Sequence, residues 1–205
     1  MTRRLKAYVA LGDSFTGGFD PAHRWPDGVA AALGPGARYA NLAEVGATSR
    51  DVEEHQLTPA LAMRPDLVSL ICGANDVLES VRPDADAYAE RLGRMFGRIR
   101  AERPGAAVFT VTYPDLSHFV ELRPHTRARV SRGVERFNAA CRELAAEHGV
   151  LCLEGAGHPG ARDPRNIAPD GFHPSPEGHR RATAEVVRAL EDWLGTRLRP
   201  KEEAA

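Results

Sequence analysis

The sequence is poor in cysteine, in aromatic residues and in net charge. Its 205 residues include three cysteines and 6% aromatic side chains, and 27 basic residues nearly cancel 28 acidic ones. This balance gives no general electrostatic reason to bind nucleic acid or an anionic membrane. An odd number of cysteines without metal-ligand spacing favours free thiols over a disulfide framework or a zinc site. We therefore expect no nucleic-acid partner and three free thiols in a reducing compartment.

Long hydrophobic runs are missing as well. No stretch approaches the roughly 18 apolar residues that span a bilayer. The apolar run after Arg4 is short and leads into Gly12-Asp13-Ser14, whereas a secretory signal needs a longer apolar region and a small-residue cleavage site. We expect a cytoplasmic protein without stable membrane association, whose hydrophobic content of 42% is that of an ordinary globular chain.

Short apolar runs recur along the chain and show little polar alternation, which is typical of strands covered on both faces of a sheet. The predicted strands are Lys6–Leu11, Ala37–Leu42, Leu67–Cys72, Ala107–Thr112 and Val150–Leu153.

Longer segments with helical periodicity separate these runs. One apolar stripe contains Tyr88, Leu92, Met95, Phe96 and Ile99, and a second contains Val130, Val134, Phe137, Cys141 and Leu144. The first helix is expected to stop near Arg103, because the following proline disfavours a helical residue before it. The last helix is predicted to begin at Ser175-Pro176, a capping residue followed by a first-turn proline, and to run through Trp193.

Strands that alternate with helices predict an α/β fold. Five strands of this kind form a mostly parallel sheet with helices on both faces, which is a three-layer α/β/α arrangement. The length of the chain fits one core. Ligands bind at the carboxyl ends of the strands in such a sheet, so the residues after each apolar run are the informative ones.

Four polar clusters are predicted to meet at this edge of the sheet. They are Gly12-Asp13-Ser14, the segment 41–46, Gly73-Ala74-Asn75-Asp76, and Asp170-Gly171-Phe172-His173. Each cluster alone is ordinary turn chemistry, since Gly, Asn and Asp favour turns. Together they supply a nucleophile, a base and an orienting acid, which independent turns have no reason to do.

The clusters contain the components of a serine hydrolase. A serine hydroxyl such as that of Ser14 is a poor nucleophile unless a neighbouring base takes its proton. His173 is the natural base, because the unperturbed pKa of histidine, about 6.5, is close to neutral pH. Asp170, three residues earlier, can accept the second imidazole N–H and fix the tautomer. We predict Ser14, His173 and Asp170 as the catalytic residues.

Attack on an ester carbonyl creates an oxyanion, which requires hydrogen-bond donors held in place. Three candidate donors follow the first three strands. They are the backbone N–H groups of Ser14 and Gly46 and the side-chain amide of Asn75.

With these residues in place, the sequence resembles the SGNH branch of the GDSL esterase/lipase family. The four residues that name the branch match Ser14, Gly46, Asn75 and His173, in the family's order. The resemblance implies a flavodoxin-like three-layer fold, a Ser-His-Asp triad, a three-donor oxyanion hole, and neither metal nor cofactor. It places residues 1–198 in one SGNH hydrolase domain, with residues 199–205 as a flexible tail. The Gly-x-Ser-x-Gly elbow of α/β-hydrolases is absent around Ser14.

The implied substrate is a small-molecule carboxylic ester, with thioesters and O-acetyl groups also open. The family includes short-chain esterases, arylesterases, thioesterases, deacetylases and lipases, and fold does not choose among them. The expected pocket walls are Phe15, Phe19 and Trp25, the Tyr113–Pro124 loop with Tyr113 and Phe119, and the loop 154–172. Phe15 and Trp25 serve equally well as core residues. No large lid insertion is evident, which favours small soluble esters; nothing in the sequence indicates an oligomeric state.

Two alternatives compete with this interpretation. A metal-dependent phosphoesterase would draw its ligands from Asp13, Asn75, Asp76, His173 and His179, but such sites usually need more tightly clustered ligands. A binding module on the same fold would lack turnover. It would have no need for the complete set of Ser14, Gly46, Asn75, Asp170 and His173.

Overall fold

The computed structural model describes residues 5–115, 117 and 121–198. A five-stranded sheet forms its centre, in the order β2-β1-β3-β4-β5, and every neighbouring pair of strands is parallel. The strands are β1 (Ala7–Gly12), β2 (Arg38–Asn41), β3 (Leu67–Ile71), β4 (Ala107–Val111) and β5 (Leu151–Leu153). The five predicted strands are confirmed, with ends that differ by at most one residue.

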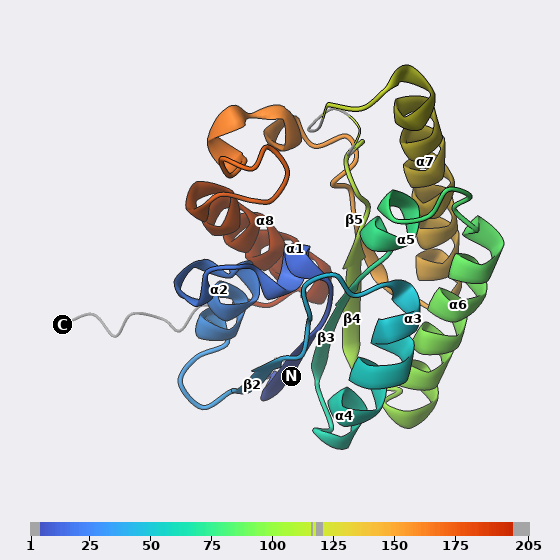
Figure 1. Ribbon diagram of the computed structural model, residues 1–205. Helices are drawn as coiled ribbons and strands as arrows, with labels where there is room; N and C mark the ends of the chain where they lie inside the picture. Colours follow the sequence, from blue (N-terminus) through green and yellow to red (C-terminus); the bar gives the residue numbers. More distant parts are fainter. Residues whose placement is uncertain (1–4, 116, 118–120, 199–205) are drawn as a thin grey trace.

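Helices cover both faces of the sheet, as predicted for a three-layer fold (Figure 1). One face is covered by α2 (Trp25–Ala32) and α8 (Pro176–Leu194). The other is covered by α6 (Ala85–Glu102), α7 (Pro124–Glu147) and a continuous helical segment. That segment consists of α3 (Ser49–Asp51), the π-helical turn η2 (Val52–Gln56) and α4 (Leu57–Ala62).

Short helical turns complete the chain. They are α1 (Ser14–Gly17), η1 (Pro21–His23), α5 (Ala74–Leu78), η4 (Pro159–Arg162) and η5 (Pro164–Asn166). Among the described residues, no helix has both the length and the apolarity to cross a membrane. The predicted tail, residues 199–205, lies outside the described part of the chain.

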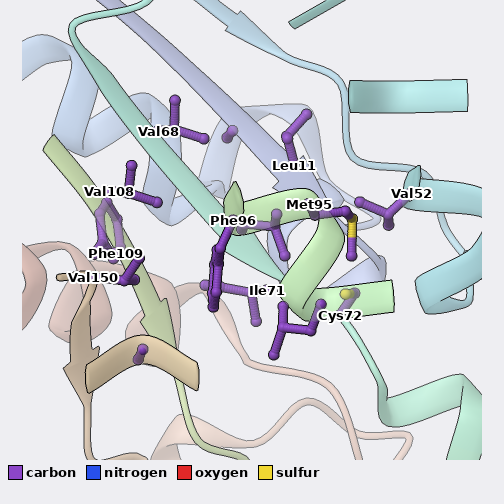
Figure 2. Close-up of a cluster of buried hydrophobic side chains, with 14 of the residues drawn as sticks. Leu11, Val52, Val68, Ile71, Cys72, Met95, Phe96, Val108, Phe109 and Val150 are labelled. Atoms are coloured by element: carbon purple, nitrogen blue, oxygen red, sulfur yellow. The ribbon is translucent and has the colours of Figure 1, made fainter. Parts of the chain in front are cut away.

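The core lies between the sheet and the helices that cover it. The side chains of β1 and β3 are buried on both faces of the sheet, which explains their unbroken apolar sequences. Phe96 and Met95 of α6 are fully buried, and Phe96 lies close to Ile71 of the sheet (Figure 2). Burying a side chain such as Phe96 contributes about 1.5–3 kcal/mol. The three cysteines are free, with Cys72 and Cys141 buried and Cys152 half-buried.

The helix ends follow local sequence signals. The predicted stop of α6 is confirmed, because Arg103 is the C-cap and precedes a proline. The predicted start of α8 is also confirmed, since the Ser175 hydroxyl accepts the N–H of Gly178 and Pro176 occupies the first turn. The helix ends at Gly195 in the left-handed conformation that glycine favours.

The order of the strands fixes where a ligand can bind. The chain runs outward from β1 to β2 and then returns to the other side of β1 to form β3. In a flavodoxin-like sheet this reversal leaves a crevice at the carboxyl ends of the two central strands. Gly12 at the end of β1 is paired in register with Ile71 at the end of β3, so the clusters that follow these strands start side by side.

Candidate active site

Ser14 lies where β1 passes into α1, and its surroundings leave the chain little freedom. Asp13 caps the turn by accepting the N–H of Phe15 at 3.0 Å. Gly12 has φ of +150°, and a Cβ there would lie 2.2 Å from the carbonyl oxygen of Ile71. Only glycine fits this passage, and Ser14 is consequently held at the edge of the sheet with 5% of its surface exposed.

A buried glutamine holds the end of β1 from behind. The side chain of Gln56, on the π-helical turn η2, accepts the N–H of Gly12 at 2.8 Å and donates to its carbonyl oxygen at 2.9 Å. The carbonyl oxygen of Gly12 also accepts the N–H of Glu44 at 3.1 Å, in the segment that follows β2, whereas Gln56 is the partner of the Gly12 N–H. Gln56 therefore satisfies the polar groups next to the nucleophile's turn.

The structure brings His173 to Ser14 across 159 residues of sequence. The Ser14 Oγ lies 3.0 Å from His173 Nε2, and His173 Nδ1 lies 2.7 Å from Asp170 Oδ2. The other oxygen of Asp170 accepts the backbone N–H groups of Phe172 and His173. Partial burial raises the pKa of Asp170, but these hydrogen bonds and the one from the imidazole outweigh it and hold the pKa below its ordinary value. Asp170 is thus a carboxylate at neutral pH.

The loop that contains His173 is tied to α8 by backbone hydrogen bonds. Ala168 N–H donates to the carbonyl oxygen of His173 at 2.7 Å, and Ser175 N–H donates to that of Asn166 at 2.8 Å. Gly178, in the first turn of α8, packs against the same Asn166 carbonyl, where a Cβ would lie only 2.3 Å away. The predicted placement of His173 on a loop just before a helix cap is confirmed.

Gly46 and Asn75 lie on adjoining segments. The Asn75 amide donates to the carbonyl oxygen of Ala47 at 2.9 Å, directly beside Gly46, which adopts φ of +82°. A side-chain amide has two N–H donors, so one remains for another acceptor. Ser49 and Asp76 reinforce the junction, since both the N–H and the hydroxyl of Ser49 donate to the Asp76 carboxylate.

Comparison with known protein families shows which family the chain belongs to. The sequence profile of the GDSL-like lipase/acylhydrolase family matches residues 10–181, which include all of the side chains described above. The chain belongs to this family. It is therefore an enzyme that hydrolyses ester bonds, and the resemblance drawn from the sequence is confirmed. The sequence matches no curated protein at a significant level.

Solved structures of GDSL proteins share the fold. The chain is similar to a lipase/acylhydrolase from Enterococcus faecalis, with a TM-score of 0.72 and 23% identity over 92% of this chain and 96% of that one. It is similar to a GDSL-like lipase from Parabacteroides merdae, with a TM-score of 0.75 and 18% identity over 92% and 97%. It is also similar to a phospholipase A1 from Streptomyces albidoflavus, with a TM-score of 0.66 and 21% sequence identity over 90% of this chain and 99% of that one. At these identities the likeness shows the fold.

Asp13 of the GDSL motif faces away from the imidazole. Its carboxyl group is fully buried and accepts the hydroxyl of Tyr113 at 2.9 Å as well as the N–H of Phe15. Burial raises the pKa of Asp13 to about 7, although both hydrogen bonds act to lower it. Asp13 therefore couples the nucleophile's turn to the segment after β4, and it is not positioned as the acid partner of His173.

The residues of the metal hypothesis do not converge on one point. Asp13 is bonded to Tyr113 and Asp76 to Ser49, while His173 is bonded to Ser14 and Asp170. In the part of the chain that the structure describes, no group of three or more His, Cys, Asp or Glu side chains could hold a metal ion.

Some residues of the predicted pocket walls are buried in the core, and others are exposed beside His173. Trp25 is buried, donates to the Phe15 carbonyl oxygen and packs on Phe109, so it is a core residue. Tyr113 was expected in the pocket wall but is buried too, and its hydroxyl donates a hydrogen bond to Asp13. Phe19 is 62% exposed, with its ring centroid 4.6 Å from that of His173. Phe119 lies outside the described residues.

Phe15 and Phe172 complete the aromatic surroundings of the imidazole. Their ring centroids lie 5.7 Å and 4.9 Å from that of His173, and the two rings meet edge to face. Sequence reasoning missed Gln56, Ser49 and the role of Tyr113. The capping box at Thr48 and Asp51 was the available signal for a helix start beside Ser49, whereas nothing near Gln56 marks its distant partner.

Proposed function

We propose that the protein is a serine esterase that cleaves small carboxylic esters through an acyl-enzyme on Ser14. The observation that carries the proposal is the continuous chain of contacts from Ser14 Oγ to His173 Nε2 and from His173 Nδ1 to Asp170. With Nδ1–H donating to the carboxylate, Nε2 is free to accept the serine proton, which is the tautomer a general base needs.

Acylation begins when Ser14 Oγ attacks the ester carbonyl carbon while its proton passes to His173 Nε2. Asp170 stabilises the imidazolium that forms. The carbonyl oxygen becomes an oxyanion, which the N–H groups of Ser14 and Gly46 and the free N–H of Asn75 stabilise. Collapse of the tetrahedral intermediate breaks the ester C–O bond, and His173 returns its proton to the leaving alcohol.

Deacylation repeats the sequence with water in place of the serine. His173 takes a proton from water, the hydroxide attacks the acyl carbon, and the second tetrahedral intermediate expels Ser14 Oγ. His173 gives its proton to Ser14, and the released carboxylic acid loses its own proton to the solvent to become a carboxylate. The side chain of Asp170 is 47% exposed and Phe19 is more exposed still, which supports access by small esters, thioesters or O-acetyl groups.

Covalent labelling tests the nucleophile. A fluorophosphonate should modify Ser14, and peptide mass spectrometry should place the adduct there. Ser14→Ala should abolish both labelling and turnover while its melting temperature stays close to that of the parent. Ser80→Ala, in a loop away from the site, is the matched control and should behave like the parent. An adduct elsewhere, or none on an active preparation, contradicts the assignment.

An acyl-length series tests the substrate class. We expect p-nitrophenyl acetate and butyrate to be cleaved with higher kcat/KM than the long-chain esters, since the imidazole is flanked by compact aromatic rings. EDTA should leave the rates unchanged. Binding of esters without any turnover across the series would instead favour the binding module.

A further inference from the structure

Gly46, whose N–H is a proposed oxyanion donor, lies in a tight turn. The N–H of Ala47 closes the turn by donating to the carbonyl oxygen of Glu44 at 3.2 Å, and Gly46 between them has φ of +82°. The first end of the turn is attached to β1, since the N–H of Glu44 donates to the carbonyl oxygen of Gly12 at 3.1 Å. The second end leads into α3, and the contacts that hold it decide where the Gly46 N–H points.

Two consecutive residues of α5 hold this second end. The Asn75 amide donates to the carbonyl oxygen of Ala47 at 2.9 Å. One carboxylate oxygen of Asp76 accepts the N–H of Ser49 at 2.7 Å, and the other accepts its hydroxyl at 2.5 Å. Ser49 is fully buried, and the side chain of Asp76 is 9% exposed. The placement of the Gly46 N–H relative to the Asn75 amide therefore depends on the contact between Ser49 and Asp76.

Arg91 of α6 lies against this contact, where α6 runs beside α3 (Figure 1). Its Nε donates to the Ser49 hydroxyl oxygen at 2.9 Å, and its Nη2 donates to Asp76 Oδ1 at 3.4 Å. A guanidinium has donors only, so the Ser49 hydroxyl must accept from Arg91 and give its own proton to Asp76. Arg91 thus fixes the direction of the hydrogen bond between Ser49 and Asp76. It also supplies the positive charge that a mostly buried carboxylate needs.

The charge of Arg91 bears on the reaction as well. Burial raises the pKa of Asp13 to about 7, and the charge of Asp76 acts in the same direction. The negative charge of Asp76 therefore reaches the turn that contains Ser14, where it would also oppose an oxyanion. Arg91 places the opposite charge next to Asp76 and so reduces this repulsion.

We propose that Arg91 is a positioning residue for the oxyanion hole, which acts through Ser49 and Asp76 on the spacing of the Gly46 N–H and the Asn75 amide. Misplacement of a catalytic group by about 1 Å can reduce a rate by about 10²-fold, so a residue that only holds the donors has a large effect on the rate. The proposal rests on the proposed function, because the spacing of these donors matters to the rate only if an oxyanion forms between them.

A double-mutant cycle tests the proposal, with Arg91→Gln and Asn75→Ala made singly and together in the full chain. Arg91→Gln should lower kcat for p-nitrophenyl butyrate by about tenfold or more and change KM by less than about twofold, because the donors act in the transition state. In the Asn75→Ala background the same substitution should cost about threefold less than in the parent, because one of the donors that it misplaces is already gone. Two losses that simply multiply would overturn the proposal.

Arg94→Gln is the matched control. Arg94 lies one turn further along α6, and its Nε and Nη2 donate to the Glu53 carboxylate at 2.8 and 2.9 Å. It links α6 to the same helical segment as Arg91 does, but through η2 rather than through Ser49. Its kcat, KM and coupling to Asn75→Ala should be those of the parent. An equal loss of kcat in Arg94→Gln and Arg91→Gln would assign the effect to the ion pairs of α6 in general and overturn the proposal.

Amide NMR adds a readout that needs no turnover. The backbone resonance of Gly46 and the side-chain resonances of Asn75 should shift in Arg91→Gln and stay in place in Arg94→Gln; unshifted resonances in folded Arg91→Gln overturn the proposal. Should Arg91→Gln fail to fold, Ser49→Ala takes its place in both measurements, since it removes the hydroxyl and keeps the backbone N–H. Failure to label Ser14 defeats the proposed function, whereas parent-like kcat and resonances in Arg91→Gln of a labelled enzyme defeat only the role of Arg91.

Discussion

The two halves of the proposed active site are built differently. Ser14 is 5% exposed at the end of a fully buried strand, and its turn is held by Gln56 and Asp13, which are themselves buried. His173 and Asp170 lie on a partly exposed loop that backbone hydrogen bonds tie to the start of α8. The core therefore fixes the proposed nucleophile, whereas local hydrogen bonding fixes the proposed base. Substitutions of the buried residues that hold Ser14 in place should affect stability as well as rate, and those in the second half should affect mainly the rate.

The largest loss of rate without a loss of stability is expected for Asp170→Asn. The amide can keep the backbone hydrogen bonds of the loop, but its N–H group favours the wrong tautomer of His173. By comparison with other triads, kcat should fall by about 10⁴-fold while the melting temperature changes little. Steady-state kinetics and calorimetry measure the two effects. Asp192→Asn, on the exposed face of α8, is the control; a comparable loss there, or a kcat of Asp170→Asn near that of the parent, would break the comparison.

Asn75 belongs to neither half and is the proposed side-chain donor to the oxyanion. Loss of one oxyanion donor should reduce turnover by about 10²–10³-fold. KM should change much less, because the interaction belongs to the transition state. Asn75→Asp should be worse than Asn75→Ala, since a carboxylate would face both the oxyanion and the Ala47 carbonyl oxygen. Turn residues tolerate Asp, so unchanged kcat and melting temperature in both variants would make Asn75 a turn residue only.

Gln56→Ala tests whether the core holds the nucleophile. The substitution leaves the buried N–H of Gly12 without a partner, at a cost of about 1–3 kcal/mol, whereas the carbonyl oxygen keeps its hydrogen bond from Glu44 N–H. Chemical denaturation should show this loss of unfolding free energy. Glu54→Ala, on the same turn but exposed, should change stability by less than about 0.5 kcal/mol. Equal stability of the two variants would show that Gly12 does not depend on Gln56.

The smallest expected effect is a pH dependence from Asp13. Its pKa is about 7 in the folded chain and near 3.8 when unfolded, so the folded state binds more protons between these values. The contribution of Asp13 to stability is therefore fully present below about pH 4 and is lost as the pH rises through 7. The melting temperature of the parent relative to Asp13→Asn should fall between pH 5 and 8. A constant difference would mean that the carboxyl group titrates normally.

Much of the fold could be predicted from the sequence, and so could the three residues, Ser14, His173 and Asp170, that the structure brings into contact. Buried parallel strands give unbroken apolar runs, and parallel strands place the residues that follow them at one edge, which is why Ser14 and Asn75 could be associated. Tyr113 could not be paired with Asp13, because 100 residues separate them and the contact depends on the packing of β4 beside β3. The burial of Trp25 could not be decided either, because an aromatic residue at this position fits both a core and a pocket wall.

The outer strands of the sheet have a consequence for how copies of the protein meet. β5 is three residues long and β2 is four, so each edge presents few unpaired backbone groups. A long, flat edge strand would be a template on which a second chain could add a strand. The longer strands β1, β3 and β4 lie between these two short edge strands, so none of them is at an edge of the sheet. The fold thereby offers little backbone for edge-to-edge aggregation.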